Sequence, residues 1–445
     1  MATVASSVAE LCASAKRASR VLARVDSEVK NAALESIATA LEDRLEEILA
    51  ANERDMQLGR EDEIGEALLD RLRLDARRVA NIARAVRQIA ALADPVGEVI
   101  DGHRLPNGLD VRKVRVPLGV VAVVYEARPN VTIDAAALCL KSGNAIVLRG
   151  SSSAEHSNAT LARIASEAAV AAGLPDGCVT LVAGGGREEL AELATQSDSV
   201  DLIIPRGGEG LKESLQAVAT VPVIYAASGN CHVYVDASAD AEQAQAIVLN
   251  AKLQRPGVCN AVETLLIHEQ IAPRFVPQVV RALTDAGVVV RGDERVLELT
   301  AQLAEQPGTR DAQRSPLDAI AALSDSALVQ PASEEDWGTE YLALTLAVAV
   351  VDSTEDAIEH VGRYGSGHSE AIVTRDTASA RAFQLGVDAA CVYVNASTRF
   401  TDGGEFGMGA EIGNSTQKLH ARGPIGLREL CTFKYLIEGD GHVRA

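Results

Sequence analysis

Short apolar runs alternate with helix-forming windows between residues 120 and 225, and this alternation restricts the fold more than any other feature of the sequence. The apolar runs cover 120–125, 145–149, 179–183, 202–205 and 222–225. Helical windows separate them at 131–141, 154–172, 187–196 and 208–218. Strands that are apolar on both faces and joined by helices form parallel sheets between helical layers. Because such sheets bind nucleotides at the carboxyl ends of their strands, we expect a nucleotide-binding α/β domain.

A second series of the same kind follows from residue 240. Its expected helices cover 240–254, 270–285, 354–363 and 376–386. Its expected strands cover 262–267, 287–291, 342–351, 370–373 and 391–394, and residues 292–340 are less regular. A chain of 445 residues is long enough for two or three packed domains. We place the break between them near residue 239.

Two further segments surround this α/β core. Residues 4–92 show apolar side chains at helical spacing, which predicts a helical N-terminal layer. Residues 97–116 form two alternating segments around Asn107-Gly108, a dipeptide that favours the tight turn of a β-hairpin. Because this hairpin is polar on both faces, we expect it to pair with another subunit.

The charge of the chain excludes one class of partner. The formal net charge is −20 and the isoelectric point is near 4.9, whereas a nucleic-acid groove needs clustered Lys and Arg. We therefore expect no nucleic-acid partner. An anionic substrate would need local arginines to overcome the overall negative field.

The cysteines and histidines indicate neither disulfides nor a metal. The seven cysteines are scattered, without CxxC pairs or metal-ligand spacing, which is typical of a reducing compartment, and the eight histidines lack HExxH or facial-triad spacing. The N-terminus has no apolar segment typical of a secretory signal, and the apolar runs are too short to cross a bilayer. We expect a cytoplasmic protein with no metal and no membrane partner.

One cysteine has an unusual setting. Cys259 lies in "QRPGVCNA", after a helix and a Pro-Gly turn and before an apolar strand. Backbone N–H groups in such a turn can stabilise a thiolate, so Cys259 is a candidate nucleophile, with an inert structural cysteine as the alternative.

Five blocks carry a resemblance to a known family, at 116–150, 201–211, 250–268, 363–374 and 392–424. In this order, over nearly the whole chain, they resemble the γ-glutamyl phosphate reductases of the aldehyde dehydrogenase superfamily. The resemblance implies an aldehyde dehydrogenase-like α/β fold with a Rossmann-type cofactor domain, an α/β catalytic domain and a small oligomerisation β-arm. It also implies reduction of L-glutamyl 5-phosphate to L-glutamate 5-semialdehyde plus phosphate, the second step of proline biosynthesis from glutamate.

On this basis each domain receives a range. The NADPH-binding domain covers 1–239 and is rejoined by about 413–427, and the catalytic cysteine domain covers 240–412. The arm consists of 97–116 and 428–445. The resemblance implies a homo-oligomer, a dimer or a tetramer, and leaves open a transient contact with glutamate 5-kinase.

The resemblance assigns the catalytic pair. Cys259 matches the family's nucleophile, which forms a thioester, and Asn130 in "ARPNV" matches the superfamily's oxyanion amide, whose alternative is a helix N-cap. Residues 223–230 contain no acid where hydrolytic members carry their general base, which disfavours a hydrolytic NAD(P)-dependent aldehyde dehydrogenase. A catalytically silent scaffold relative is the other alternative, and the intact Cys259 and Asn130 disfavour it.

Cofactor and substrate residues follow from the same blocks. Arg149 and Ser152 suit the 2′-phosphate of NADPH better than the free hydroxyl of NADH, and a surface cation is the alternative reading of Arg149. The glycine turn, a weak motif, and one acid complete the cofactor set: Pro205, Arg206, Gly207, Gly208 and Glu340. The turn at 184–186 is interpreted as structural. Donors for the substrate's phosphate and carboxylate are Arg128, Arg255, Ser397, Thr398 and Arg399, and for each arginine a structural ion pair is the alternative.

Overall fold

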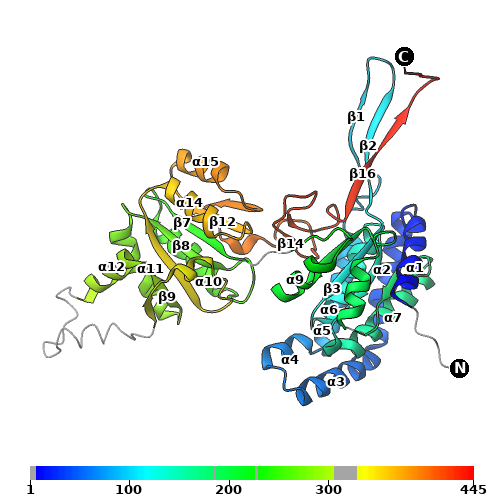
Figure 1. Cartoon of the computed structure of the whole chain (residues 1–445), viewed down its shortest axis with the longest axis horizontal. Coiled ribbons are helices and arrows are strands. Elements are labelled where there is room, and N and C mark those ends of the chain that lie inside the picture. The colour runs from blue at the N-terminus through cyan, green and yellow to red at the C-terminus, as the bar shows by residue number, and fades with distance from the viewer. Residues whose placement is uncertain (1–6, 185, 226–228, 305–327, 445) are drawn as a thin grey trace. The chain divides into compact units, whose positions relative to one another are not determined.

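The structure, a computed structural model, describes residues 7–184, 186–225, 229–304 and 328–444. It divides into two compact units, and many of their elements are labelled in Figure 1. Unit 1 consists of 1–226, 407–413 and 417–445, and unit 2 consists of 227–406 and 414–416. The boundary expected at 239 thus lies inside unit 2, after its first strand, and the chain returns to unit 1 at 407, before the expected 413.

Unit 1 contains a parallel sheet in the order β5-β4-β3-β6. Its strands are β3 (Val120–Tyr125), β4 (Ala145–Arg149), β5 (Val179–Leu181) and β6 (Leu202–Arg206). Every residue of β3 and β4 is buried, as the apolar runs predicted. The run at 222–225 contributes only a single bridge from Val223 to Ile203. Because the chain reverses direction across the sheet between β3 and β6, their carboxyl ends form the point where such sheets bind ligands.

The helices of unit 1 cover this sheet and share one apolar core with it. The described part of the N-terminal layer contains α1 (Val8–Leu22), α2 (Ser27–Asp43), α3 (Leu45–Glu61), α4 (Glu66–Leu72) and α5 (Ala76–Ala91). The crossovers contain α6 (Pro129–Lys141), η1 (Ser152–Ala154), α7 (Glu155–Ala171), α8 (Arg187–Ala194) and α9 (Glu209–Val218). Helix α1 begins where Ser7 and Glu10 cap each other's backbone amides.

A three-stranded antiparallel sheet projects from the helices of unit 1 (Figure 1). It consists of β1 (Val99–Arg104), β2 (Asp110–Pro117) and β16 (Cys431–Glu438), in the order β1-β2-β16. The predicted hairpin is present, and Gly108 in its turn has a φ of 93°, which glycine adopts without strain. We call this sheet the β-arm.

Unit 2 contains a second parallel sheet in the order β10-β9-β11-β8-β7-β12-β13. Its strands are β7 (Cys231–Val235), β8 (Val262–His268), β9 (Val289–Gly292), β10 (Val329–Pro331), β11 (Thr345–Val351), β12 (Ser369–Val373) and β13 (Cys391–Val394). Its helices are α10 (Ala241–Leu253), α11 (Ala272–Asp285), α12 (Glu294–Ala304), η2 (Glu334–Gly338), α14 (Thr354–Tyr364), α15 (Thr377–Gly386) and η3 (Thr398–Phe400). The short strands β14 (Asn414–Ser415) and β15 (Gly423–Pro424) lie near the end of the chain.

The two faces of this second sheet carry separate apolar cores. Val233 and Val235 of β7 join one cluster with the buried faces of α10 and α11, whereas Tyr234 joins the other with α14 and α15. Successive side chains of a strand point to opposite faces, so a strand covered on both sides reads as one continuous apolar run. This arrangement leaves the ends of the strands as the accessible part of the sheet.

Within the described residues, no helix combines the length and the apolar character needed to cross a bilayer. Nor does any group of three or more His, Cys, Asp and Glu side chains in that part of the chain lie in an arrangement that could hold a metal ion.

Candidate functional site

Cys259 lies on the loop that joins α10 to β8. Helix α10 ends at Leu253 and β8 begins at Val262, so residues 254–261 lie at the amino end of β8. The seven cysteines are all among the described residues, and the other six are buried, whereas Cys259 is partly exposed. A partly exposed thiol can react with a substrate, and a buried one cannot.

A buried ion pair joins the two ends of this loop. Lys252 in the last turn of α10 and Glu263 on β8 are both fully buried, and Nζ lies 2.5 Å from Oε2. The ammonium group also donates to the Val262 carbonyl at 3.0 Å, and Glu263 Oε1 accepts from the backbone N–H of Leu342 at 3.3 Å. The pair therefore fixes the points where the loop leaves the helix and enters the strand.

The residue after Cys259 is anchored by the segment around η3. The Asn260 side chain donates to the Thr401 carbonyl at 2.9 Å, and the Thr398 hydroxyl donates to the Asn260 carbonyl at 2.7 Å. Thr398 is fully buried and Ser397 is 4% exposed, and the Ser397 hydroxyl accepts from the Arg399 N–H at the start of η3. Both residues were predicted to bind the substrate, and both hydroxyl groups form hydrogen bonds within the protein.

Two arginines carry positive charge at the Cys259 loop: Arg255 is part of the loop, and Arg399 interacts electrostatically with Cys259. Burial and the neighbouring Arg255 lower the pKa of Arg399, and interactions with Cys259 and Asp402 oppose this shift. Arg399 also donates from Nε to Gln254 Oε1 at 2.7 Å, while Arg255 is exposed. The mutual repulsion of the two guanidinium groups would be relieved by an anion, and the charge of Arg399 favours a thiolate at Cys259.

Glu340 lies in the same unit as Cys259. Its Oε1 accepts a hydrogen bond of 2.7 Å from the backbone N–H of Gly229. A Cβ atom on Gly229 would lie 1.7 Å from the Cys259 carbonyl oxygen, so the two backbones are in direct contact. Glu340 is thus linked to the Cys259 loop through one residue.

Asn130 lies in the first turn of α6, directly after β3. Arg128 is the N-cap of this helix and Pro129 follows it, so the alternative that Asn130 caps the helix is wrong. Asn130 Nδ2 donates to Asp134 Oδ2 at 2.9 Å, one turn further along α6. Burial raises the pKa of Asp134 to about 6, while the hydrogen bond from Asn130 and the charge of Arg206 act to lower it. This contact orients the amide and leaves its second N–H available as a donor.

Arg149 ends β4 at the carboxyl edge of the sheet in unit 1. It is 7% exposed, and its Nη2 donates to the Gly186 carbonyl at 2.6 Å, so the surface-cation reading is wrong. Burial lowers the pKa of Arg149, and the carboxylate of Glu189 partly offsets the shift. Ser152 is exposed at the start of η1. The buried Glu189 Oε2 and Ser151 Oγ have no hydrogen-bond partner among the described residues, which is typical of a polar site built for a ligand.

The glycine turn after β6 lies at the same edge. Gly208 is the N-cap of α9, and its N–H donates to Glu126 Oε2 at 3.1 Å. Arg206 pairs with Tyr125 across β6 and β3, and Pro205 precedes it in β6. The predicted cofactor residues of unit 1, from Arg149 to Gly208, therefore gather at the carboxyl ends of β4 and β6.

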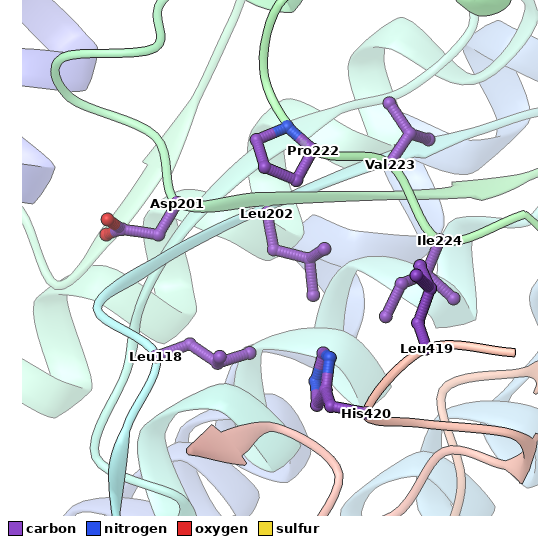
Figure 2. A pocket seen from close by; sticks show the side chains of 8 residues that line it. All are labelled: Leu118, Asp201, Leu202, Pro222, Val223, Ile224, Leu419 and His420. Carbon is purple, nitrogen blue, oxygen red and sulfur yellow. The ribbon is translucent and has the colours of Figure 1, made fainter. Parts of the chain in front are cut away.

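A cavity of about 510 Å³ lies at the opposite edge of this sheet (Figure 2). Leu118 and Asp201, which line it, precede β3 and β6, so the cavity lies at the amino ends of the strands. Its other lining residues are Leu202, Pro222, Val223, Ile224, Leu419 and His420. None of the predicted site residues is among them.

The structure thus gathers the predicted residues in two sets, one in each unit. Unit 1 holds Arg128, Asn130, Arg149, Ser152 and the turn 205–208, and unit 2 holds Cys259, Arg255, Glu340 and 397–399. Sequence reasoning missed Asp134, Glu189, Cys231 and the Lys252–Glu263 pair. Asp134 could have been found, because it is four residues after Asn130 on a helix, whereas the others depend on contacts between distant elements.

Comparisons with known proteins agree with this architecture. The sequence profile described as the aldehyde dehydrogenase family matches residues 2–305. The γ-glutamyl phosphate reductase of Moorella thermoacetica is 53% identical over 430 residues, which cover 97% of each chain. That of Thermobifida fusca is 50% identical over 444 residues, which cover 100% of each chain. The crystal structure of γ-glutamyl phosphate reductase from Thermotoga maritima superimposes with a TM-score of 0.91 at 43% identity, covering 99% of this chain and 100% of that one.

Proposed function

The chain belongs to the aldehyde dehydrogenase family and, within it, to the γ-glutamyl phosphate reductases, and from this premise we propose how its residues perform the reaction. The reaction reduces L-glutamyl 5-phosphate to L-glutamate 5-semialdehyde and releases phosphate, the second step of proline biosynthesis from glutamate. One observation carries the proposed mechanism: Cys259 alone among the seven cysteines is partly exposed, and it interacts with the positive charge of Arg399.

Cys259 acts as the nucleophile. Its thiolate attacks the acyl carbon, the bond from this carbon to the phosphate oxygen breaks, and phosphate leaves with the electron pair, so that a thioester remains on Cys259. When bound, the nicotinamide cofactor supplies the hydride that reduces the acyl carbon. The thiolate of Cys259 then departs and the aldehyde is released. The charge of Arg399 supports the thiolate at the beginning and end of this cycle.

Asn130 donates to the oxyanion. Negative charge develops on the acyl oxygen in each tetrahedral intermediate, and a fixed donor stabilises it without reorganisation. The hydrogen bond to Asp134 supports this role, because it holds the Asn130 amide in one orientation. The backbone N–H of Cys259 is the second proposed donor.

Arginine side chains bind the anionic groups of the substrate. Arg255 is exposed and Arg399 is partly buried beside it, so this pair can bind a phosphate or a carboxylate. Arg128 at the start of α6 is a third candidate. Ser397 and Thr398 complete the proposed set, and the contacts of their hydroxyl groups support an indirect role, in which they hold η3 and the Cys259 loop in place.

NADPH is the proposed cofactor. The buried Arg149, the exposed Ser152 and the unpartnered Ser151 hydroxyl can donate to an anionic group at the carboxyl end of β4, which favours a 2′-phosphate over a free hydroxyl. The turn from Pro205 to Gly208 would hold the pyrophosphate at the N-terminus of α9. Glu340 would bind the nicotinamide ribose.

The reverse reaction tests this assignment. Wild type should reduce NADP⁺ with glutamate 5-semialdehyde only when phosphate is present, because phosphate is the acyl acceptor. Cys259→Ala should lose this activity completely, while the control Cys178→Ala, which removes a buried thiol of unit 1, should retain it. Turnover without phosphate would indicate the hydrolytic alternative. The absence of turnover in wild type would indicate the catalytically silent relative.

The β-arm is the proposed oligomerisation surface. Beyond Cys431 every residue of β16 is exposed, and Phe433, Tyr435 and Ile437 are 46%, 57% and 59% exposed on one face of the strand. Such an apolar face favours a second copy of the chain as its partner, giving a dimer or a tetramer. Ile437→Ser together with Phe433→Ser should shift the mass in sedimentation velocity toward the monomer. An unchanged mass would exclude this surface.

We place the reaction in the cytoplasm. All seven cysteines are free thiols, which is the state that a reducing compartment maintains. Fractionation of the source cells by immunoblot tests this location, and recovery outside the cytoplasmic fraction would contradict it.

A further inference from the structure

Cys231 brings a second thiol to the Cys259 loop. It is the first residue of β7, it pairs with Val262 at the start of β8, and it is fully buried. Because β7 and β8 are parallel neighbours, their amino ends lie at the same edge of the sheet, directly beneath the loop. Cys231 Sγ donates a hydrogen bond of 3.1 Å to the Cys259 carbonyl oxygen.

The surroundings of Cys231 keep it a neutral donor. Burial raises the pKa of this thiol well above its ordinary value, and Glu370, Cys259 and Glu263 raise it further, against a backbone hydrogen bond from Ser369. His368 Nδ1 lies 3.9 Å from the sulfur, and burial lowers the pKa of His368 to about 4. A neutral imidazole and a neutral thiol therefore lie beneath the loop at physiological pH.

The close contact with Gly229 limits what else can reach the Cys259 carbonyl group. A Cβ atom on Gly229 would lie 1.7 Å from the carbonyl oxygen and 2.3 Å from its carbon, so the Gly229 backbone covers that side of the peptide. The thiol of Cys231 approaches the same oxygen at hydrogen-bond distance. If Cys231 lost its donor, the partly buried carbonyl group would have to find a new partner, and the peptide would rotate to do so.

We propose that Cys231 is a positioning residue for the nucleophile, which fixes the Cys259–Asn260 peptide and thereby the direction in which Cys259 Sγ points. This inference rests on the proposed role of Cys259. Rotation of this peptide would change both the aim of the sulfur and the orientation of the loop that carries it. A small change in the aim of a nucleophile reduces the rate of the chemical step more than it reduces substrate binding.

Three substitutions separate the donor from the volume of the side chain. Cys231→Ser retains a donor, Cys231→Ala removes it, and Cys231→Val removes it while filling the space. Because a thiol is a weak donor, we expect kcat to fall about three- to tenfold in the Ala and Val variants, with KM for the semialdehyde nearly unchanged. Cys231→Ser should recover most of the loss. The buried control Cys178→Ala should behave as wild type.

A second readout reports on Cys259 directly. The rate at which iodoacetamide alkylates Cys259, followed by peptide mass spectrometry across pH 6 to 9, should change in the Ala and Val variants and return toward wild type in the Ser variant. If all variants that fold match wild type in kcat and in this pH profile, the inference is wrong. Failure of the proposed function is distinguishable from this, because then Cys259→Ala would itself remain active.

Discussion

Removal of the ammonium group of Lys252 should destabilise unit 2 in a pH-dependent manner. Burial raises the pKa of Glu263 to about 7, and the charge and hydrogen bond of Lys252 are the two largest effects that oppose this shift. Lys252→Met removes both effects while keeping the length of the side chain. The pKa of Glu263 must therefore rise above 7 in the variant.

The sign and size follow from proton linkage. A carboxyl group whose pKa is higher in the folded state binds its proton more tightly there, so the free energy of unfolding falls as pH rises from the ordinary value of 4.5 to the folded value. In wild type this loss ends near pH 7, after about 2.5 pH units or roughly 3 kcal/mol. In Lys252→Met it continues, at about 1.4 kcal/mol per pH unit.

The pH-dependent part of the stability difference between the two proteins is therefore small at pH 6 and is on the order of 1 kcal/mol at pH 8. The lost hydrogen bond to the Val262 carbonyl adds a cost that is the same at both pH values. Urea unfolding measures both parts. The single tryptophan, Trp337, lies in unit 2 and reports its unfolding by fluorescence.

A matched control is the double variant in which Glu263→Gln accompanies Lys252→Met. It contains no titratable group at this position, so its destabilisation should be independent of pH between 6 and 8. If the loss of stability in Lys252→Met is itself independent of pH, then Glu263 is not a charged partner of Lys252, and the prediction is wrong.

Three further predictions concern the site. Gly229→Ala should abolish turnover, because the new methyl group would collide with the backbone of Cys259. The control Gly362→Ala should be neutral, because among the described residues no atom beyond its own helix lies within 4 Å of the added methyl group. Comparable kcat values in the two variants would contradict this prediction. Asp134→Asn should remove an apparent pKa near 6 from the pH profile of kcat/KM. Because the pKa of Asp134 is raised in the folded state, the stability of wild type falls as pH rises from 4 to 6. In urea titrations Asp134→Asn should therefore gain stability relative to wild type over that range. Arg149→Leu should weaken NADPH binding in calorimetry by about 10- to 100-fold and NADH binding much less, since a charge-assisted hydrogen bond to the phosphate is lost; equal losses would exclude the 2′-phosphate as its partner.

The fold was predictable where strands are apolar on both faces. The run from Val120 to Tyr125 became β3, and the helices on both sides of it followed from their own periodicity. Strand β7 was absent from the predicted series, which passed from the run at 222–225 directly to the helix at 240–254. The segment 292–340 was read as irregular, but its described part contains α12, β10 and η2, while 305–327 lies outside the described residues.

The candidate site was predictable only where one segment carries its own signal. The Pro-Gly turn before Cys259 singled out that cysteine locally, and the structure supports the choice through its exposure. The thiol of Cys231 gives no such signal in the sequence. Its contact with Cys259 exists because β7 and β8 are neighbours with Cys231 opposite Val262, a register that only the folded sheet defines.

The segment around η3 shows how a binding motif can act through the loop it supports. A direct contact of Thr398 with substrate would require its hydroxyl group to leave the Asn260 carbonyl, which is buried and would lose its partner. Arg399 has a guanidinium group that faces the charge of Arg255, so binding an anion there relieves repulsion. Because Asn260 follows the nucleophile directly, Thr398→Val should lower kcat, whereas Arg399→Leu should mainly raise KM. Steady-state kinetics with the semialdehyde and phosphate distinguish these outcomes, and a KM effect in Thr398→Val alone would assign its hydroxyl group to the substrate instead.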